Sequence, residues 1–340
     1  MKPSFKLCSA LVVAFAAVGM AHADAPKYVL KLAHADSTDL SVSRKAVMAQ
    51  VFQKEVEAKS HGQIKVEVFG GGALGGEKQY VEGVKNGFIQ AGLASAVVAD
   101  YFPPAMVTDI PYLFPSTTIA DKVMDGPFGK KLSAEFEAKT GMINLCFGEV
   151  GYRDFTSGKK PIESPADLKG MKIRVMESPV YVTEMKALGA QPTPVAWPET
   201  YSALQTGVVD GEENPVPSVL SAKFYEVQKY LTLDGHNYGV DWFVMNGKFY
   251  NGLPANLQAV VRSAAQDSCD AERRVNRKFT ADDIKVLEQK GMTVYTPTAA
   301  QISQFRADTQ KPVADWISQK VGAQWVDGVL AAVKSAEAGQ

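Results

Sequence analysis

The sequence has few of the residues on which catalytic and metal sites usually depend. Its 340 residues include three cysteines and four histidines, and the formal net charge is −1. It contains no H-E-x-x-H, no G-x-S-x-G and no His/Cys cluster with the spacing of metal ligands. It also lacks any block of like charge, so nothing predicts a nucleic-acid partner. With few candidates for a general base, the sequence favours a binding protein over an enzyme.

With so few cysteines, only one possible disulfide has to be considered. Cys8 lies in the N-terminal apolar segment, too early for a lipoprotein cysteine, so Cys146 and Cys269 remain. An oxidising compartment permits a disulfide between them. Two cysteines far apart in a large domain do not form a disulfide framework, however. Because free cysteine is among the most buried residue types, we expect two buried free thiols, with a disulfide as the alternative.

The N-terminus has the pattern of a secretory signal peptide. Lys2 and Lys6 precede an apolar run over residues 7–20, and a small-x-small sequence ends at Ala23. The run is too short to span a bilayer, and the charges that would make it an anchor are absent. We expect cleavage after Ala23, which leaves 34 basic and 37 acidic side chains and a charge of −3. The protein is therefore predicted to be periplasmic, without direct membrane insertion.

Hydrophobic periodicity predicts an alternating α/β chain. Strands are expected at residues 28–33, 64–69, 88–94, 142–149, 171–175, 238–245 and 292–295. Helices are expected at residues 40–60, 77–86, 119–140, 165–168, 179–188, 198–207, 222–230 and 254–291, and after residue 299. Such alternation predicts open sheets with helices on both faces, and the length predicts two lobes. A helix over 254–291 would extend roughly 50 Å, enough to cross both lobes.

A glycine-rich stretch over residues 70–78 is similar to a phosphate-binding loop. That loop needs Lys and then Ser or Thr directly after its last glycine. Here Glu77 intervenes, and Gln79 stands where the hydroxyl should be. The dinucleotide fingerprint also fails, because no acidic residue follows at the expected distance. We therefore predict a flexible loop that leads into a helix, and no nucleotide cofactor.

Several polar residues fall at or near the ends of predicted strands, where ligands bind in open α/β sheets. They are Arg153, Arg174, Ser95 and His34. The planar guanidinium of arginine matches a carboxylate bidentately and stays charged at any working pH. Each arginine also has a structural alternative, since Arg174 could point outward in a surface or hinge ion pair and Arg153 could pair with the adjacent Asp154 or with Glu149. A histidine in a loop after the first strand is usually only exposed.

From residue 151 onward the chain resembles a known receptor family. The matching segments are GYRDFTS, SPADLKGMKIRV, ALGAQPTPVAWPETYSALQTGVVDGEENP and KFYEVQKYLTL. They are similar to the solute-binding proteins of tripartite ATP-independent periplasmic (TRAP) transporters, dicarboxylate-receptor type. The resemblance covers essentially the whole chain after the signal peptide. It implies a two-lobed periplasmic binding protein fold of the α/β class, with hinge strands and a long helix that braces both lobes.

The resemblance implies chain crossings near Glu149 and Asn237, so that each lobe is discontinuous. The implied parts are residues 1–23 as signal peptide, 24–149 plus 238–278 as lobe I, and 150–237 plus 279–340 as lobe II.

The resemblance also assigns roles to individual residues. Arg174, in the KIRV strand, stands where the family's ligand-selecting arginine is found, and Arg153 matches a second arginine. Asn214 matches the amide of the D-G-x-E-N-P turn, and Trp197 is the aromatic residue before the P-E-T-Y helix. Asn is also favoured in turns for backbone reasons, and tryptophan is commonly a core residue. The E-N-P sequence replaces the one found in a metal-dependent subgroup, which implies no metal ion.

Tyr238 and Asp241 follow the second implied crossing. Both could belong to the hinge packing or face the cleft. If Asp241 faces the cleft, it suits a ligand with hydroxyl or amine groups better than a simple dicarboxylate.

The resulting hypothesis is a periplasmic receptor that captures a small organic acid and delivers it to the membrane subunits of a TRAP transporter. A receptor that feeds a sensor protein would have the same pocket and differ only in its partner surface. A secreted enzyme acting on carboxylates is the other alternative. Its best acid/base pair would be Glu212 and Glu213, but adjacent residues point in different directions and suit that chemistry poorly.

Overall fold

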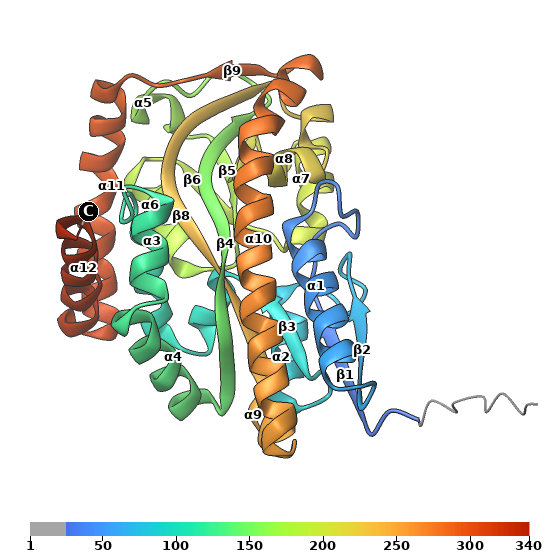
Figure 1. Ribbon diagram of the computed structural model, residues 1–340. Helices are drawn as coiled ribbons and strands as arrows, with labels where there is room; N and C mark the ends of the chain where they lie inside the picture. Colours follow the sequence, from blue (N-terminus) through green and yellow to red (C-terminus); the bar gives the residue numbers. More distant parts are fainter. Residues whose placement is uncertain (1–24, 340) are drawn as a thin grey trace, which may run out of the picture.

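One mixed β-sheet runs through the molecule (Figure 1). The computed structural model describes residues 25–339, and the predicted signal peptide lies outside the described residues. The strand order is β2-β1-β3-β8-β4-β7-β5-β6, with β9 beside β8. The strands are β1 (Tyr28–Ala33), β2 (Ile64–Phe69), β3 (Ala91–Ala94), β4 (Met142–Ser157), β5 (Lys172–Val175), β6 (Gln191–Pro194), β7 (Gly211–Asn214), β8 (Tyr230–Asn246) and β9 (Thr293–Tyr295).

Two long antiparallel strands, β4 and β8, connect the two lobes. At one end β8 pairs with β3, where Trp242 lies opposite Ala94, and at the other end β4 pairs with β7, where Asp154 lies opposite Asn214. The implied crossings lie inside these strands, where Glu149 pairs with Val240 and Arg153 with Asn237. The sequence predicted only the lobe I half of each strand. The two-lobed fold is confirmed, but both lobes share one continuous sheet.

The helices cover both faces of this sheet (Figure 1). They are α1 (Arg44–Lys59), α2 (Glu77–Asn86), α3 (Thr117–Met124), α4 (Pro127–Thr140), α5 (Pro165–Leu168), α6 (Pro179–Ala187), α7 (Thr200–Gln205), α8 (Val216–Ser221), α9 (Gly247–Asn251), α10 (Ala255–Gln289), α11 (Ala299–Val321) and α12 (Ala323–Ala338). Short 3-10 helices stand at Ala96–Asp100, Pro103–Asp109, Trp197–Glu199 and Phe224–Glu226. None of the described helices is both long and apolar enough to cross a membrane.

The helix predicted over residues 222–230 is wrong. The helix of this region, α8, begins earlier because two prolines, Pro215 and Pro217, fit its start. Lys223 then takes a left-handed backbone conformation with φ of 57°, which ends the helical path. A further predicted helix, over 119–140, is divided at Gly126 into α3 and α4.

The long helix α10 matches its prediction and runs beside β4 and β8 (Figure 1). Its 35 residues correspond to about 52 Å at 1.5 Å per residue. The helix packs against α1, β4 and α8, so it contacts both lobes. A disulfide between Cys146 of β4 and Cys269 of α10 ties it to the sheet. The predicted free thiols are therefore wrong, because residues 123 apart in sequence have Cα atoms only 6.4 Å apart in the fold.

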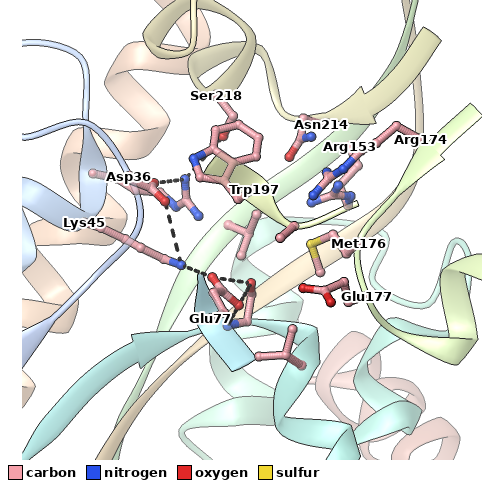
Figure 2. A pocket seen from close by; sticks show the side chains of 15 residues that line it. Asp36, Lys45, Glu77, Arg153, Arg174, Met176, Glu177, Trp197, Asn214 and Ser218 are labelled. Atoms are coloured by element: carbon pink, nitrogen blue, oxygen red, sulfur yellow. Dashed lines mark hydrogen bonds and ion pairs between the residues drawn. The ribbon is translucent and has the colours of Figure 1, made fainter. Parts of the chain in front are cut away.

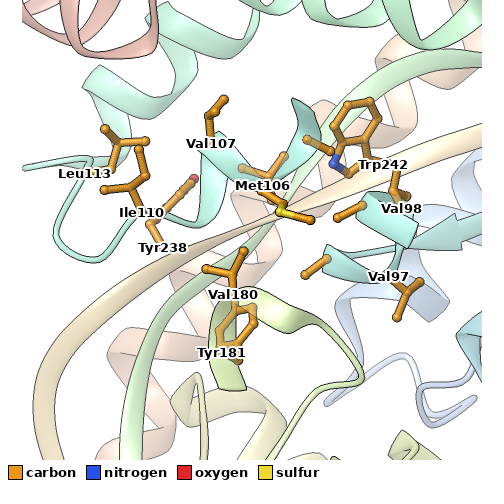
Figure 3. Packing of buried hydrophobic residues seen from close by; sticks show 14 of the residues in the cluster. Val97, Val98, Met106, Val107, Ile110, Leu113, Val180, Tyr181, Tyr238 and Trp242 are labelled. Carbon is orange, nitrogen blue, oxygen red and sulfur yellow. The ribbon is translucent and has the colours of Figure 1, made fainter. Parts of the chain in front are cut away.

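Apolar side chains fill both lobes and the region between them. The largest cluster includes Val180 and Tyr181 of α6 together with Tyr238 and Trp242 of β8 (Figure 3). Helix α6 lies at the lobe II end of the sheet, and β8 runs through both lobes. The packing between them therefore fixes the strand ends from which the pocket described below is built.

Candidate ligand-binding site

A pocket lies between the two lobes and draws side chains from both (Figure 2). It contains about 480 Å³ of space not filled by protein atoms, part of it continuous with solvent. We call its two sides the lobe I wall and the lobe II wall. The lobe I wall includes Asp36, Arg44, Lys45, Glu77, Ser95 and Val97. The lobe II wall includes Arg153, Arg174, Met176, Glu177, Ala196, Trp197, Asn214 and Ser218.

Arg174 reaches the pocket from β5 and has no carboxylate partner among the described residues. Its side chain is buried, and Nε and Nη2 donate to the carbonyl oxygen of Val195 at 3.0 and 2.7 Å. Its Nη1 is buried without a hydrogen-bond partner. Burial lowers the pKa of Arg174 to about 10, because Glu212 and Glu213 offset the lost hydration only in part. The ring of Trp197 lies 5.8 Å from the guanidinium carbon.

Arg153, on β4, has a carboxylate partner by comparison. Its Nη2 donates to Oε1 of Glu213 at 2.9 Å and to the carbonyl of the same residue, and Nε donates to Oε2. The carboxylate of Glu213 also lies 3.4 Å from Nε2 of His236, whose Nδ1 is 3.0 Å from Asp234. Arg153 therefore enters the pocket wall with its charge already compensated.

Asn214 ends β7 and is held by its neighbours in the sheet. Its Nδ2 donates to Oε2 of Glu212, and the hydroxyl of Thr156 donates to Oε1 of the same carboxylate at 2.8 Å. Burial raises the pKa of Glu212 to about 6, although these two hydrogen bonds act against the rise. The amide is thus oriented at the pocket wall by a buried carboxylate.

The lobe I wall begins with two cations in the first turn of α1. A helix N-terminus disfavours positive charge, so Arg44 and Lys45 need carboxylate partners. Arg44 lies 3.0 Å from Asp241 and 3.2 Å from Asp36. Lys45 lies 2.6 Å from Glu77 and 3.2 Å from Asp241. Each cation of this wall therefore has at least two anionic neighbours.

Glu77 stands where the glycine-rich loop enters α2. Its Oε2 accepts from the backbone N–H of Ser95 at 2.9 Å and from the Ser95 hydroxyl at 2.8 Å. Ser95 therefore lines the pocket as a partner of Glu77.

The same glycine-rich loop meets the lobe II wall at the rim of the pocket. A Cβ atom on Gly72 would lie 3.3 Å from Cγ of Pro198, and one on Gly76 would lie 3.6 Å from Cβ of Ala196. Elsewhere along the rim, Nη1 of Arg44 donates to the hydroxyl of Ser218 at 3.3 Å. The two lobes are thus in contact over the pocket, which is a closed arrangement.

Five of the eight residues proposed from the sequence line the pocket: Arg174, Arg153, Asn214, Trp197 and Ser95. Strand ends and helix starts bring them together, as expected for an open α/β sheet.

The other three proposed residues, His34, Tyr238 and Asp241, do not line the pocket. His34 is buried beneath Gly70 beside a separate groove, and burial lowers its pKa to about 4. Tyr238 packs against Phe114 and donates to Glu149 at 3.0 Å, so it belongs to the hinge. Asp241 lies behind the wall as the partner of Arg44 and Lys45.

The lobe I wall was missed almost entirely by the sequence analysis. The missed residues include Asp36, Arg44, Lys45 and Glu77. Two signals were present, namely adjacent cations at a helix start and a glutamate directly after a glycine-rich loop. Both patterns are common on protein surfaces, so neither identifies a pocket without the fold.

The chemistry of the pocket suits the binding of an anion. It offers an unpartnered guanidinium N–H, an amide and a hydroxyl, together with carboxylates that are already paired. Glu212 and Glu213 engage different partners, Asn214 and Arg153, and form no facing pair. Among residues 25–339, no group of three or more His, Cys, Asp or Glu side chains is arranged to hold a metal ion.

Known proteins share both the sequence pattern and the fold. A 32% identical relative over 314 residues is the C4-dicarboxylate-binding periplasmic protein DctP of Rhodobacter capsulatus, with 91% of each chain covered. Among solved structures, the sugar acid binding protein DctPAm of Advenella mimigardefordensis in complex with galactonate is 33% identical with a TM-score of 0.87, and 92% of this chain and 100% of that chain are covered. A TRAP periplasmic solute-binding protein of Polaromonas, bound to D-erythronate, is 34% identical with a TM-score of 0.84, and 89% and 98% are covered.

The family model for bacterial extracellular solute-binding proteins, family 7, matches residues 34–320, which include both walls of the pocket. The chain therefore belongs to family 7 of the bacterial extracellular solute-binding proteins.

Proposed function

We propose that this protein is a periplasmic receptor that holds a small organic acid by its carboxylate and delivers it to a TRAP transporter. The observation that carries the proposal is the buried Arg174, whose Nη1 has no partner within the described part of the chain. A buried cation without a partner is costly, and a carboxylate that accepts from it removes that cost. Arg174 is thus the anchor of the site.

The neighbouring residues support this role without competing for it. Arg153 is neutralised by Glu213, so it shapes the wall and adds little net charge. Trp197 lies against the guanidinium, where it excludes water and strengthens the electrostatic attraction between anion and cation. Asn214, held by Glu212, offers a fixed polar group beside the anchor.

The relatives point to the same chemistry. The names of three relatives mention C4-dicarboxylates, galactonate and D-erythronate as the bound compounds. Each of these compounds carries a carboxylate. Solved relatives described as TRAP solute-binding proteins support delivery to TRAP membrane subunits. Contacts of the lobes over the pocket support a mechanism in which closure buries the ligand and presents a joint surface to that partner.

The remaining sequence predictions complete the proposal. Export would use cleavage after Ala23, as the signal pattern indicates. The lobe boundaries stay as predicted, with residues 24–149 plus 238–278 and 150–237 plus 279–340. The packing of α11 against α6 supports the C-terminal part of lobe II, although α12 packs against α3 of lobe I.

Titration calorimetry on the mature protein tests the anchor. We expect Arg174→Ala to weaken the binding of D-galactonate or succinate, whichever binds the wild type, by at least tenfold. Arg306→Ala, which removes an exposed arginine of α11, is the matched control and should leave affinity unchanged. Equal affinity of the wild type and a folded Arg174→Ala variant would overturn the proposal.

A further inference from the structure

We infer that the pocket is built for a hydroxylated acid with a single carboxylate and that it discriminates against dicarboxylates of the same length. This inference rests on the proposed function, because it takes Arg174 as the site of the first carboxylate. It concerns what the rest of the pocket accepts.

The pocket supplies only one unpaired cation among the described residues. Four cationic side chains line it, namely Arg44, Lys45, Arg153 and Arg174. The first three have carboxylate partners at hydrogen-bond distance, and Arg174 has none. One carboxylate can therefore gain a free positive partner, and a second cannot.

The lobe I wall lies opposite Arg174 in Figure 2, and together with Asp241 behind it the wall carries more negative than positive charge. Three carboxylates, those of Asp36, Glu77 and Asp241, surround the two cations Arg44 and Lys45. Although burial disfavours its charge, Asp36 keeps a pKa below its usual value because Lys45 and Arg44 are close. The wall thus has an excess of one negative charge.

A further carboxyl group behind this wall, that of Glu272, does not change the sign of the excess charge. Glu272 lies 3.3 Å from Arg44, and burial together with the charge of Asp241 raises its pKa well above the usual range. A carboxyl group adds no positive charge in either protonation state, so the excess negative charge of the wall with Asp241 stands. At the rim, Glu177 adds another carboxylate whose cationic neighbour, Lys78, is 3.9 Å away.

A hydroxyl group fits this wall where a carboxylate does not. Oδ1 of Asp36 has no cation closer than Lys45 at 3.9 Å, so it has capacity to accept a hydrogen bond. A ligand hydroxyl can donate to such an oxygen and accept from Lys45, whose ammonium group has three N–H donors. A second carboxylate has no proton to donate, and it would be buried next to like charge.

Two matched pairs of acids test the inference by calorimetry. D-galactonate and galactarate share one six-carbon skeleton and differ at the terminal carbon, which is a hydroxymethyl group in one and a carboxylate in the other. D-erythronate and meso-tartrate form the same pair at four carbons. We expect the monocarboxylate of the better-binding pair to bind at least tenfold more tightly than its dicarboxylate, and hexanoate to bind at least tenfold more weakly than D-galactonate. A dicarboxylate that binds as tightly as its partner, or hexanoate that binds as tightly as D-galactonate, overturns the inference.

A charge-neutral substitution then locates the selection. Glu77→Gln keeps the size of the side chain and removes one negative charge, so the preference for the monocarboxylate should narrow at least threefold. Asp36→Asn should act in the same direction and serves as the second variant if Glu77→Gln folds poorly. Glu82→Gln, at an exposed position of the same helix α2, should leave the preference unchanged. An unaltered preference in folded Glu77→Gln and Asp36→Asn variants refutes the role of the lobe I wall.

Failure of the inference and failure of the proposed function give different results. If Arg174→Ala weakens every acid but dicarboxylates bind best, only the inference falls. If Arg174→Ala leaves the binding of all four acids unchanged, the carboxylate anchor itself is wrong.

Discussion

Two buried arginines stand side by side in the lobe II wall and differ in one respect (Figure 2). Arg153 is bound by the carboxylate of Glu213, whereas the hydrogen bonds that Arg174 makes within the described part of the chain go to the carbonyl of Val195. Both are almost completely removed from water. The difference shows that burial alone does not mark a binding residue. Under the proposed function, a charge that the protein leaves uncompensated does mark one, because the ligand supplies the missing partner.

The same contrast recurs between two buried glutamates of lobe II. Glu213 lies between Arg153 and His236, and despite burial these cations hold its pKa below the usual range. Within residues 25–339, neither carboxyl oxygen of Glu184 on α6 has a hydrogen-bond partner, and burial raises the pKa of Glu184 to about 8. In both comparisons an oppositely charged partner shifts the pKa toward the charged form, and without such a partner burial shifts the pKa toward the neutral form.

The largest expected effect comes from removing the paired arginine. Arg153→Met leaves the Glu213 carboxylate buried without its cation, so we expect the free energy of unfolding to fall by about 3–5 kcal/mol. Urea denaturation of the ligand-free protein measures this change. Adding Glu213→Gln to the same chain should recover a large part of it, because the orphaned charge is then gone. If the single variant is as stable as the wild type, the assigned pairing is incorrect.

Removing the unpaired arginine should change the ligand-free stability little and the binding of the acid strongly. Arg174→Met deletes a buried charge that has no partner and loses two hydrogen bonds to Val195. We expect the ligand-free free energy of unfolding to stay within about 1 kcal/mol of the wild type, or to rise. The stabilisation that a bound acid gives the wild type, about 2.7 kcal/mol at a ligand concentration of 100 times Kd, should fall to about half of that value or less. A loss of stability as large as that of Arg153→Met would erase the contrast between the two residues.

The glutamate comparison predicts a pH dependence of stability. The folded pKa of Glu184, about 8, exceeds the ordinary glutamate value of 4.5, so the native state holds a proton that the unfolded state has released. Stability from this group is therefore complete below pH 4.5 and declines as pH rises toward 8, by at most about 1.4 kcal/mol per pH unit. His236, Glu213, Asp234 and Arg153 all act on Glu184, so the whole protein will show a combined slope.

Comparison with a neutral variant isolates the contribution of Glu184. Between pH 6 and 8, Glu184→Gln should lose less stability in urea denaturation than the wild type does. Parallel curves for the two proteins would show that Glu184 is not protonated in the native state.

Much of the fold was predictable because it depends on local patterns, and much of the pocket was not. The periodicity of residues 254–291 predicted α10 closely, since a long amphipathic run has no alternative. The place of Arg174 in the pocket wall was predictable because the family motif gave its position, and its role as carboxylate anchor stays a prediction. The pairing of Glu213 with Arg153, rather than Asp154, depends on the register between β4 and β7, which no local pattern contains. The Cys146–Cys269 disulfide was mispredicted for the same reason.

The smallest effect should come from the rim of the pocket, where closure keeps Arg174 away from water. Gly72 has φ of 74°, and a Cβ there would lie 3.3 Å from Cγ of Pro198 across the rim. Gly71 has a similar φ of 65°, but its Cβ would meet only Thr38, at 3.9 Å. Both alanine variants carry comparable backbone strain. Only Gly72→Ala also hinders closure, so we expect it to bind the acid about threefold more weakly than Gly71→Ala does.

The ligand-free state separates this effect from a general weakening of the loop. Gly72→Ala and Gly71→Ala should unfold at similar urea concentrations without ligand, because strain at a positive φ is common to both. A difference in affinity measured by calorimetry then comes from the closed state alone, in which Arg174 binds the carboxylate out of contact with water. If the two variants bind equally, contact at the rim does not control closure, and the uncompensated charge of Arg174 must be protected from water by the lobe II wall itself.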